Sequence, residues 1–315
     1  MPPVDRKAPK RSKSSDSTYS LMEFTREFPD DDACLDWLWR QRYSADGKHA
    51  DCPKCEREGV VFKHYKTAQR RQTWTCTACG HHVQPTAGTI FHGSSTSLHL
   101  WFYAMYLITS TRCGISAKQL ERELGVTYKT AWRMFNRIRN ELMRDDGERQ
   151  LWGDVEVDET SVDGRPRRKA RSKKEAAQLR ERSRATVVGM AERGGNVRVR
   201  VVPSRRGPAL SQAVRQNVSP RAMLITDDWQ AYKPLDRDFV AHRKINHSTG
   251  LYVDGDIHTN TIEGFFGNMK TGIRGVYKHV SHRWLQSYLD EYAWRYNHRR
   301  GRRSMFETLL VRAAE

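Results

Sequence analysis

The stretch Asp154-Val155-Glu156-Val157-Asp158-Glu159-Thr160 alternates valines with acidic residues, which is typical of a β-strand with one buried and one polar face. Such a strand buries its valines and lines up Asp154, Glu156 and Asp158 on the opposite face. Three carboxylates on one face repel one another unless a cation lies nearby or most of them reach water. The stretch therefore predicts either a solvated edge strand or one wall of a metal site.

Two later stretches favour the metal site. The segment Ile225-Thr226-Asp227-Asp228-Trp229 follows an apolar run and ends in acids, as the first strand does. The segment His258-Thr259-Asn260-Thr261-Ile262-Glu263 then opens a predicted helix. Mg²⁺ prefers carboxylates, water and phosphate oxygens as ligands. Acids from three separated elements suit a two-metal site for phosphodiester chemistry, which is the hypothesis that these stretches raise.

The predicted helix after residue 258 has two distinct faces. Its apolar face comprises Phe266, Met269 and Ile273, at steps of three and four. A second face carries Asn260, Glu263 and Lys270. Glu263 can therefore face a metal while Lys270, two turns later, faces a DNA phosphate. The alternative is a surface glutamate on a helix that packs on the core.

Basic residues outnumber acidic ones and gather in one segment. The 315 residues include 55 Lys+Arg and 37 Asp+Glu, a formal net charge of +18. Between Gly164 and Arg184 there are ten Arg or Lys and two Glu, a local net charge of +8. Clustered cations that bind a polyanion release its counterions, which favours binding. The segment therefore predicts double-stranded DNA as a partner; the alternative is a basic surface that contacts only solvent. The DNA-contacting residues predicted in this loop are Arg165, Arg167, Arg168, Lys169, Arg171, Lys173 and Lys174.

Two CxxC pairs predict a zinc ribbon. They begin at Cys52 and Cys76 and are separated by 20 residues. Zinc takes four soft ligands in a tetrahedron, and each CxxC turn offers two thiolates. Residues 60–65 and 71–75 alternate like two strands of a ribbon, and the polar flanks argue against four unligated thiols in a core. We therefore expect one structural Zn²⁺ held by Cys52, Cys55, Cys76 and Cys79.

Residues 116–142 predict a helix, a glycine turn and a second helix. Gly125 marks the turn, and Thr127 suits the N-cap of the second helix. The apolar face of that helix is predicted to comprise Trp132, Phe135, Ile138 and Leu142. This pattern fits a helix-turn-helix; an ordinary αα-hairpin is the alternative, and the basic context favours DNA. The exposed residues predicted to contact DNA are Tyr128, Lys129, Arg133 and Arg137.

Three features of the sequence predict the cellular compartment of the protein. Its first 20 residues mix Lys and Arg with Ser and Pro, which predicts a disordered basic arm and no secretory signal. The longest apolar run, residues 98–108, falls short of the roughly 20 residues that span a membrane. Six cysteines without a signal peptide indicate a reducing compartment. We therefore expect a cytoplasmic, nucleoid-associated protein with no membrane partner.

The order of elements after residue 150 predicts the fold class. The acidic strand precedes a predicted hairpin over residues 186–190 and 197–202, then a helix and another strand. Three meandering strands, a helix and a strand is the order of the ribonuclease-H-like fold, within an α+β or α/β class. The predicted divisions are a basic arm (1–20), a zinc-ribbon domain with an N-terminal helix (21–95), a helix-turn-helix domain (96–148) and a catalytic domain (149–315) with a basic insertion (164–184).

Taken together, these motifs resemble bacterial insertion-sequence transposases of the ISXO type, relatives of eukaryotic Merlin elements. The resemblance runs from about Leu35 to Leu310, and it is specific because it rests on many motifs rather than on three acids. The matching motifs are the two CxxC pairs and residues 86–91 (TAGTIF), 128–132 (YKTAW), 156–160 (EVDET), 226–227 (TD), 258–266 (HTNTIEGFF) and 296–299 (YNHR).

The resemblance implies a site of three catalytic acids, Asp158, Asp227 and Glu263. It implies two Mg²⁺ (or Mn²⁺) ions held by these acids, one activating water and one stabilising the leaving oxygen. Lys270 matches a basic residue of the family pattern, and Asn260 is a supporting candidate on the same helix face. Both would act beside the metal site rather than as its main ligands.

One position departs from the family pattern. Asp228 stands where relatives usually have glycine, so either Asp227 or Asp228 could be the ligand. Asp227 is preferred because it directly follows Thr226, as in the family motif. Period-two alternation would then send the two side chains to opposite faces of the strand.

The function that the resemblance implies is DNA transposition. The protein would bind terminal inverted repeats, release a 3′-OH at each element end and join it to target DNA. The zinc ribbon and helix-turn-helix would recognise the ends, and the basic loop would hold flanking or target phosphates. Pairing two ends implies at least a homodimer. The alternatives are a regulator that keeps the DNA-binding modules without catalysis and a metal-dependent nuclease without strand transfer.

Overall fold

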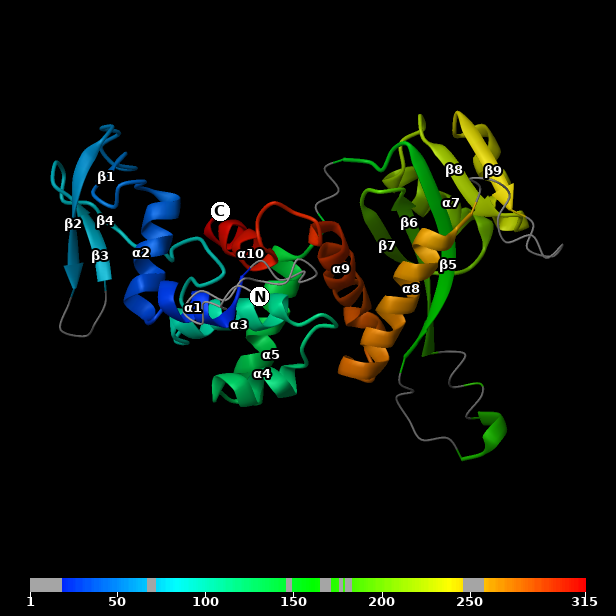
Figure 1. The fold of residues 1–315 in the computed structure, drawn as a ribbon, viewed down its shortest axis with the longest axis horizontal. Coiled ribbons are helices and arrows are strands. Elements are labelled where there is room, and N and C mark those ends of the chain that lie inside the picture. Colours follow the sequence, from blue (N-terminus) through cyan, green and yellow to red (C-terminus); the bar gives the residue numbers. More distant parts are fainter. Residues whose placement is uncertain are drawn as a thin grey trace, which may run out of the picture. The chain divides into compact units, whose positions relative to one another are not determined.

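The computed structural model is a mixed α+β structure with one four-stranded and one five-stranded sheet (Figure 1). It describes residues 19–66, 72–145, 149–164, 171–175, 178, 183–245 and 258–315. The chain divides into two compact units: one joins Arg299–Glu315 to the residues up to Ser110, and the other is Thr111–His298. The predicted mixed class is confirmed. Among helices in the described ranges, none is long and apolar enough to cross a membrane.

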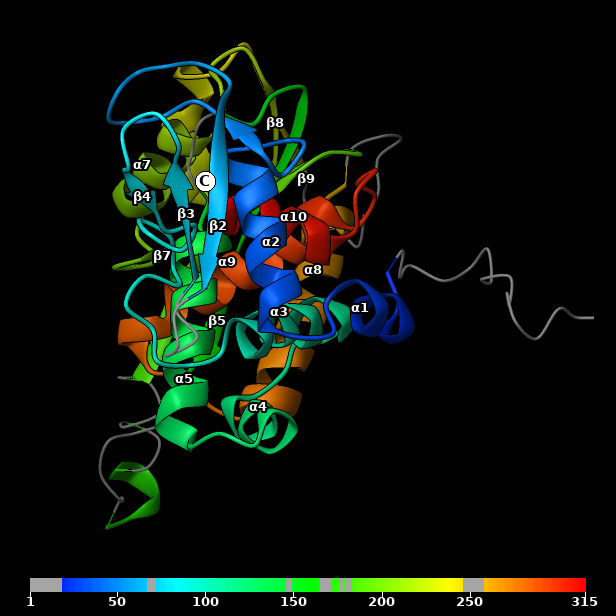
Figure 2. The same ribbon diagram turned by 90° about the vertical axis from the view of Figure 1, so that its left-hand side faces the viewer.

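The first unit is built on the four-stranded antiparallel sheet, in the order β1-β2-β3-β4. Helix α2 lies beside this sheet (Figure 2), and its buried Trp39 stacks on Trp74 of β3 at 5.0 Å between ring centroids. Helix α10 packs Phe306 against Phe24 and Phe28. The elements are α1 (Leu21–Glu27), α2 (Asp31–Arg42), β1 (His49–Ala50), β2 (Val60–Lys66), β3 (Gln72–Cys76), β4 (His82–Val83), α3 (Leu98–Ser110) and α10 (Met305–Ala314).

The second unit is built on the five-stranded sheet, in the order β7-β6-β5-β8-β9. Strands β5, β6 and β7 form an antiparallel meander, whereas β8 runs parallel to both β5 and β9. Its elements are α4 (Ala117–Leu124), α5 (Tyr128–Arg137), η1 (Ile138–Leu142), β5 (Asp154–Asp163), β6 (Arg184–Glu192), β7 (Val197–Val202), α7 (Gly207–Asn217), β8 (Met223–Asp227), η2 (Gln230–Arg237), β9 (Ala241–Ile245), α8 (Asn260–Gly272), η4 (Ile273–Tyr277) and α9 (His282–His298).

Helices cover both faces of the larger sheet. The valines of β5, Val155 and Val157, are fully buried in an apolar cluster with α7 and η2. Helices α8 and α9 form the cluster on the other face. Gly189 of β6 lets α8 lie close to the sheet, because a Cβ there would come within 2.6 Å of Ile262 and Phe266. The acidic face of β5 therefore points toward α8, since alternate residues of a strand face opposite sides.

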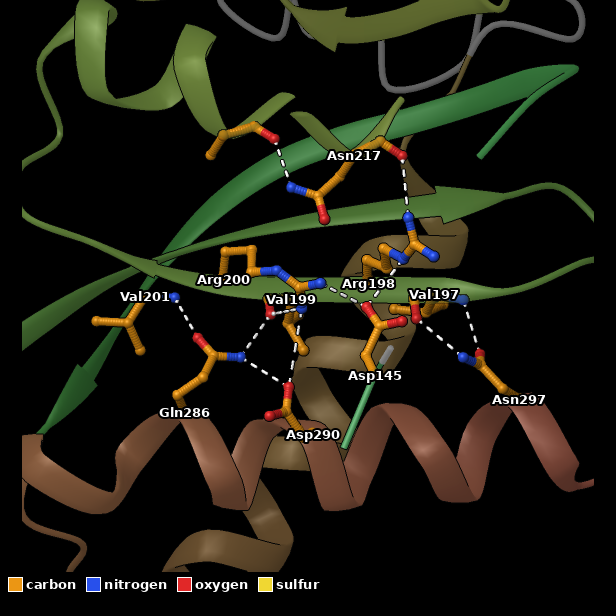
Figure 3. A network of polar contacts seen from close by, with 11 residues as sticks. Asp145, Val197, Arg198, Val199, Arg200, Val201, Asn217, Gln286, Asp290 and Asn297 are labelled. Carbon is orange, nitrogen blue, oxygen red and sulfur yellow. Dashed lines mark hydrogen bonds and ion pairs between the residues drawn. The ribbon is translucent and has the colours of Figure 1, made fainter. Parts of the chain in front are cut away.

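The edge strand β7 is covered by side chains of α9 (Figure 3). The amide of Asn297 accepts a hydrogen bond from Val197 N–H (2.7 Å) and donates one to Val197 O (3.1 Å). Gln286 accepts from Val201 N–H (2.8 Å) and donates to Val199 O (2.9 Å). These two side chains complete backbone hydrogen bonds that a neighbouring strand would otherwise make.

Helices α4 and α5 meet at a tight glycine turn. Gly125 ends α4 in the left-handed conformation (φ 63°), which favours glycine. The Thr127 side chain then caps α5 by accepting the Thr130 N–H. One expectation for α5 is wrong: Trp132 is 37% exposed rather than part of the buried face, and its ring edge contacts Trp284.

The two compact units do not follow the order of the chain. Helix α10 belongs to the first unit although it comes last, and α4, α5 and η1 belong to the second unit. The domain limits at 95/96 and 148/149 are divisions by expected function, and they stay predictions.

Candidate active site and metal centres

Three acids from three elements meet on the α8 side of the larger sheet. The parallel register pairs Glu156 of β5 with Ile225 of β8, so Asp158 and Asp227 each lie two residues further along adjacent strands. Glu263 lies in the first turn of α8. The pKa of Asp158 is raised to about 7, first by burial and then by the negative charge of Glu159, with further contributions from Asp227 and Glu263. Of the three acids that the sequence singled out, Asp227 and Glu263 therefore lie near enough for their charges to act on Asp158.

These acids fit a site for hard divalent cations. Their oxygen ligands are of the type that Mg²⁺ prefers, and burial together with the nearby negative charges raises the pKa of Asp158.

Asp227 and Asp228 lie in different environments. Asp227 is half-buried, its charge acts on Asp158, and its Oδ1 accepts the Trp229 N–H at 3.4 Å. Asp228 is exposed, and its N–H donates to Ile245 O at 2.9 Å. The neighbouring side chains thus differ in environment, as strand alternation requires.

Glu156 has a different environment from Asp158, although both lie on the same face of β5. It is fully buried, and its Oε2 accepts the N–H groups of Thr261 (2.8 Å) and Ile262 (3.1 Å). Its Oε1 accepts Arg193 Nε (2.9 Å) and the Thr261 hydroxyl (3.0 Å). The sequence aligned Glu156 with the other acids but did not show these partners, because they lie far along the chain.

Glu159, on the opposite face of β5, belongs to a second polar group that sequence reasoning missed. It accepts hydrogen bonds from the Tyr232 hydroxyl (2.6 Å) and from Arg205 Nη2 (2.7 Å). The Arg205 guanidinium also lies over the Trp229 ring, 5.2 Å from its centroid. An open cavity of about 570 Å³ adjoins this group, lined by Ser204, Arg205, Arg206, Gly207, Trp229, Gln230, Ala231 and Pro234.

Strand β8 is held at its acidic end by a chain of hydrogen bonds. The Thr226 hydroxyl donates to Asp227 O (2.7 Å) and lies 2.9 Å from His242 Nε2. His242 Nδ1 in turn lies 2.5 Å from Asp236 Oδ1, and the other oxygen of Asp236, Oδ2, pairs with Lys244 Nζ at 2.8 Å. Thr226 precedes Asp227 in the predicted motif, and this contact gives it a structural role there.

The four predicted cysteines form a metal-binding group in the first unit. Cys52 Sγ lies 3.6 Å from Cys79 Sγ, and Cys55 Sγ lies 4.0 Å from Cys76 Sγ. All four sulfur atoms lie within 4.8 Å of one another. A tetrahedral zinc ion with Zn–S bonds of about 2.3 Å requires sulfurs about 3.8 Å apart. The group therefore fits a structural zinc ion.

The predicted DNA-contacting residues of α5 are largely at the surface. Tyr128, Lys129 and Arg133 are exposed, and Lys118 Nζ lies 4.8 Å from the centre of the Tyr128 ring. Arg137 is only half-exposed, and its guanidinium binds both oxygens of Glu141 at 2.8 and 3.0 Å.

The remaining predicted residues lie in two places. Of the basic segment, Arg171, Lys173 and Lys174 are described and exposed. Those outside the described residues are Arg165, Arg167, Arg168 and Lys169. On α8, Asn260 is exposed at the first position and Lys270 is half-buried near the end.

Comparisons with known proteins agree on one family. A family model described as the ISXO2-like transposase domain matches residues 150–297, which include the three acids. An uncharacterized protein in transposable element ISH50 of Halobacterium salinarum is 33% identical over 226 residues, covering 67% of this chain and 74% of that protein. An uncharacterized transposase-like protein of Haemophilus influenzae is 29% identical over 97 residues, covering 31% of this chain and 77% of that protein.

Proposed function

Since this chain belongs to the ISXO2-like transposases, we propose that it binds the terminal inverted repeats of an insertion sequence and catalyses metal-dependent DNA cleavage and strand transfer. The resemblance to insertion-sequence transposases is thereby confirmed. The observation that supports the proposed chemistry is the placement of Asp227 and Glu263 near enough to Asp158 for their negative charges to act on it.

Asp158, Asp227 and Glu263 are the residues that would hold two Mg²⁺ or Mn²⁺ ions. The bound ions supply water activation and stabilisation of the leaving oxygen. Asp158 must give up its proton to serve as a ligand, because only the ionised carboxylate coordinates. Lys270, on the same face of α8 two turns after Glu263, would bind a DNA phosphate.

The proposed reaction has two phosphoryl-transfer steps. In the first, water attacks the phosphodiester at the element end, so one P–O bond forms and the bond to the departing 3′ oxygen breaks. In the second, the released 3′-OH attacks a target phosphodiester, which frees a 3′-OH on the target strand. The first step converts one phosphodiester and one water into a 5′-phosphate and a 3′-OH, and the second step exchanges one phosphodiester for another. Water and the 3′-OH are the nucleophiles, so no covalent protein intermediate is required.

We assign the second unit to the ribonuclease-H-like fold. This assignment is supported by the sheet order β7-β6-β5-β8-β9, with an antiparallel meander followed by two parallel strands. Helix α7 lies between β7 and β8 in the chain, as the sequence predicts for this fold. The acids then sit on two adjacent central strands and on the late helix α8.

We assign DNA recognition to three parts of the chain. The zinc ribbon and the α4–α5 pair would recognise element ends, with Tyr128, Lys129 and Arg133 presented to the DNA. The basic segment 164–184 would hold phosphates without reading sequence. Acting on chromosomal DNA places the protein in the cytoplasm with the nucleoid, and joining two ends calls for at least a dimer.

One experiment separates this function from its two rivals. The purified protein is incubated with Mg²⁺ and DNA that carries the element ends, and cleaved and joined products are scored. A transposase gives both products, a nuclease gives only cleavage, and a non-catalytic regulator gives a bound complex alone. Absence of joined product from paired ends would contradict the proposal.

The acids are tested in the same assay. Asp158→Ala, Asp227→Ala and Glu263→Ala should each reduce cleavage and joining by at least a thousandfold, because each removes a metal ligand. Binding to the ends, measured by gel shift, should persist. Asp228→Ala is the matched control and should keep substantial activity. An inactive Asp228→Ala beside an active Asp227→Ala would contradict the assignment.

A further inference from the structure

We propose that Glu156 is a positioning residue: its carboxylate fixes the start of α8 on β5 and so sets Glu263 beside Asp158. This inference rests on the proposed metal site of the three acids. The sequence offered Glu156 only as one of several acids on the strand face. Its contacts exclude it as a free metal ligand, because both oxygens are already occupied by hydrogen-bond donors.

The start of α8 depends on Glu156 for its backbone hydrogen bonds. The first N–H groups of a helix have no partner within the helix, and the N-cap residue Thr259 provides no side-chain cap here. Glu156 Oε2, which is 105 residues earlier in the chain, accepts the Thr261 N–H at 2.8 Å and the Ile262 N–H at 3.1 Å. A carboxylate at this position is also favoured by the helix dipole.

Arg193, which directly follows β6, stabilises this arrangement. Its Nε donates to Glu156 Oε1 (2.9 Å), and its Nη2 donates to the His258 carbonyl (2.9 Å), just before the helix. Arg193 thus gives the buried carboxylate an opposite charge and at the same time holds the chain that enters α8. A buried charge without such a partner would be strongly destabilising.

Apolar packing alone would not fix Glu263 in place. Ile262 and Phe266 bury α8 against Gly189, but apolar contact is non-directional and leaves small shifts along the helix axis and rotations about it cheap. The hydrogen bonds to Glu156, by contrast, involve two specific backbone amides, those of Thr261 and Ile262. Ile262 directly precedes Glu263. Each residue adds about 1.5 Å along a helix, so this bond ties Glu263 to β5.

The same carboxylate is tied to the other side of the site. Asp158 lies two residues beyond Glu156 on the same strand face, a separation of about 6.5–7 Å along the strand. Glu156 therefore sets the position of Glu263 relative to Asp158. This relative position decides whether both carboxylates can coordinate the same pair of metal ions. Functional constellations need their ligands held to within about 0.5 Å.

The test compares two buried carboxylates of the same sheet. In the full-length, zinc-loaded protein, Glu156→Gln keeps the size of the side chain but replaces one acceptor oxygen by an NH₂ group. The control is Glu192→Gln. Glu192 is 5% exposed on β6, and it accepts the N–H groups of Trp152 (2.9 Å) and Asn196 (3.1 Å) and a bond from Arg149.

The first readout is Mn²⁺ binding, measured by electron paramagnetic resonance without DNA. Changing groups that orient metal ligands typically lowers metal affinity 10- to 100-fold. We expect a loss of this size in Glu156→Gln and less than twofold in Glu192→Gln.

The second readout is hydrogen exchange, in which the Thr261 and Ile262 amides should exchange faster only in Glu156→Gln. Equal Mn²⁺ affinity in wild type and Glu156→Gln, or equal loss in both variants, would overturn the inference.

A milder variant covers the case in which Glu156→Gln does not fold. Thr261→Val keeps the shape of the side chain and removes its hydroxyl bond to Glu156 (3.0 Å). It should weaken Mn²⁺ binding in the same direction by a smaller factor, and unchanged affinity would count against the inference. In cleavage assays, excess Mn²⁺ should restore much of kcat to either variant, which mere loss of folded protein would not allow.

Failure of this inference can be told apart from failure of the proposed function. If wild-type protein binds Mn²⁺ in a way that Asp158→Ala abolishes but does not cleave DNA, the proposed function is wrong, and the Mn²⁺ affinities still decide the role of Glu156. If wild-type protein shows no Mn²⁺ binding that depends on Asp158, the inference is wrong as well.

Discussion

Burial, the charge of Glu159 and then those of Asp227 and Glu263 raise the pKa of Asp158 to about 7. At the scale of single residues, this means that the ionised form of Asp158 is disfavoured in the folded protein without a bound cation. A carboxyl group whose pKa rises on folding stabilises the fold while it is protonated, and that contribution is lost as pH rises through the folded pKa. Metal binding then reverses the effect, because it favours the ionised form.

Asp158→Asn should therefore stabilise the Mg²⁺-free, zinc-loaded protein at pH 8 and make little difference at pH 5. At pH 8 the substitution removes a buried, repelled charge, which we expect to be worth about 1–2 kcal/mol, or roughly 2–8 °C in Tm. At pH 5 the wild-type side chain is already neutral. Thermal unfolding at the two pH values measures the difference.

The exposed Asp228 provides the control for that experiment. Asp228→Asn should leave Tm within about 1 °C of wild type at both pH values, because surface substitutions rarely matter much. If Asp158→Asn gave the same change in Tm at pH 5 and pH 8, the titration of Asp158 would not be the cause.

Local patterns predicted much of this site and missed what long-range contacts decide. Alternation in β5 and the motifs around Asp227 and Glu263 led to three acids, of which two act by their charge on the third, Asp158. Alternation could not show that the Glu156 carboxylate would accept hydrogen bonds from backbone amides 105 residues later in the chain. For the same reason it did not assign partners to Glu159, whose environment depends on η2 and on the chain before α7.

At the scale of elements, the zinc ribbon is the part whose structure depends most on an ion. Cys76→Ser should lower zinc content below one per chain and weaken binding to element ends, because a hydroxyl is a poor zinc ligand. The melting of the second unit should be unchanged. Metal analysis and gel shifts measure both effects, with the exposed Cys113→Ser as the control that keeps zinc. Full zinc occupancy in Cys76→Ser would contradict the site.

The basic segment should add affinity that depends on salt but not on sequence. Replacing the exposed Arg171, Lys173 and Lys174 by glutamine should flatten the slope of log affinity against log salt by about 2–3, if each contacts a phosphate. The loss should be equal for element ends and unrelated DNA. Filter-binding titrations over a range of salt concentrations provide the slopes.

Cations that already have carboxylate partners provide a matched comparison. Arg40, Lys66 and Arg215 pair with Asp36, Asp32 and Asp238 at 2.6–2.7 Å. Replacing these three should change the salt slope by less than one. A similar slope change for both sets would mean that overall charge, rather than the segment, sets the affinity.

At the scale of the whole molecule, the last helix belongs with the first residues. Phe306 of α10 contacts Phe24 at 5.6 Å and Phe28 at 6.0 Å between ring centroids. No local pattern could predict that α10 packs against residues near the start of the chain. The amphipathic pattern of α10 shows that one of its faces is buried, but it does not show which element covers that face. The placement of α4 and α5 in the second unit escaped prediction for the same reason.

Phe306→Ala should therefore destabilise the first unit and spare the second. Removing a buried phenylalanine typically costs about 3–5 kcal/mol. Hydrogen exchange should speed up in α1, α2 and α3 and stay unchanged in β5–β8. Phe265→Ala, at a buried position of α8, is the converse control and should affect the five-stranded sheet instead. Equal effects on both units would contradict this division of the core.

The covering of β7 by α9 has a consequence for biosynthesis. The amide of Asn297 that pairs with Val197 leaves the ribosome 100 residues after that strand. At about 5–20 residues per second this is an interval of roughly 5–20 s. During it the nascent sheet presents an open edge, and such an edge is a template for pairing with another chain. Chains stopped before Gln286 should therefore self-associate on release, which sedimentation can detect, whereas translation through residue 297 closes the edge.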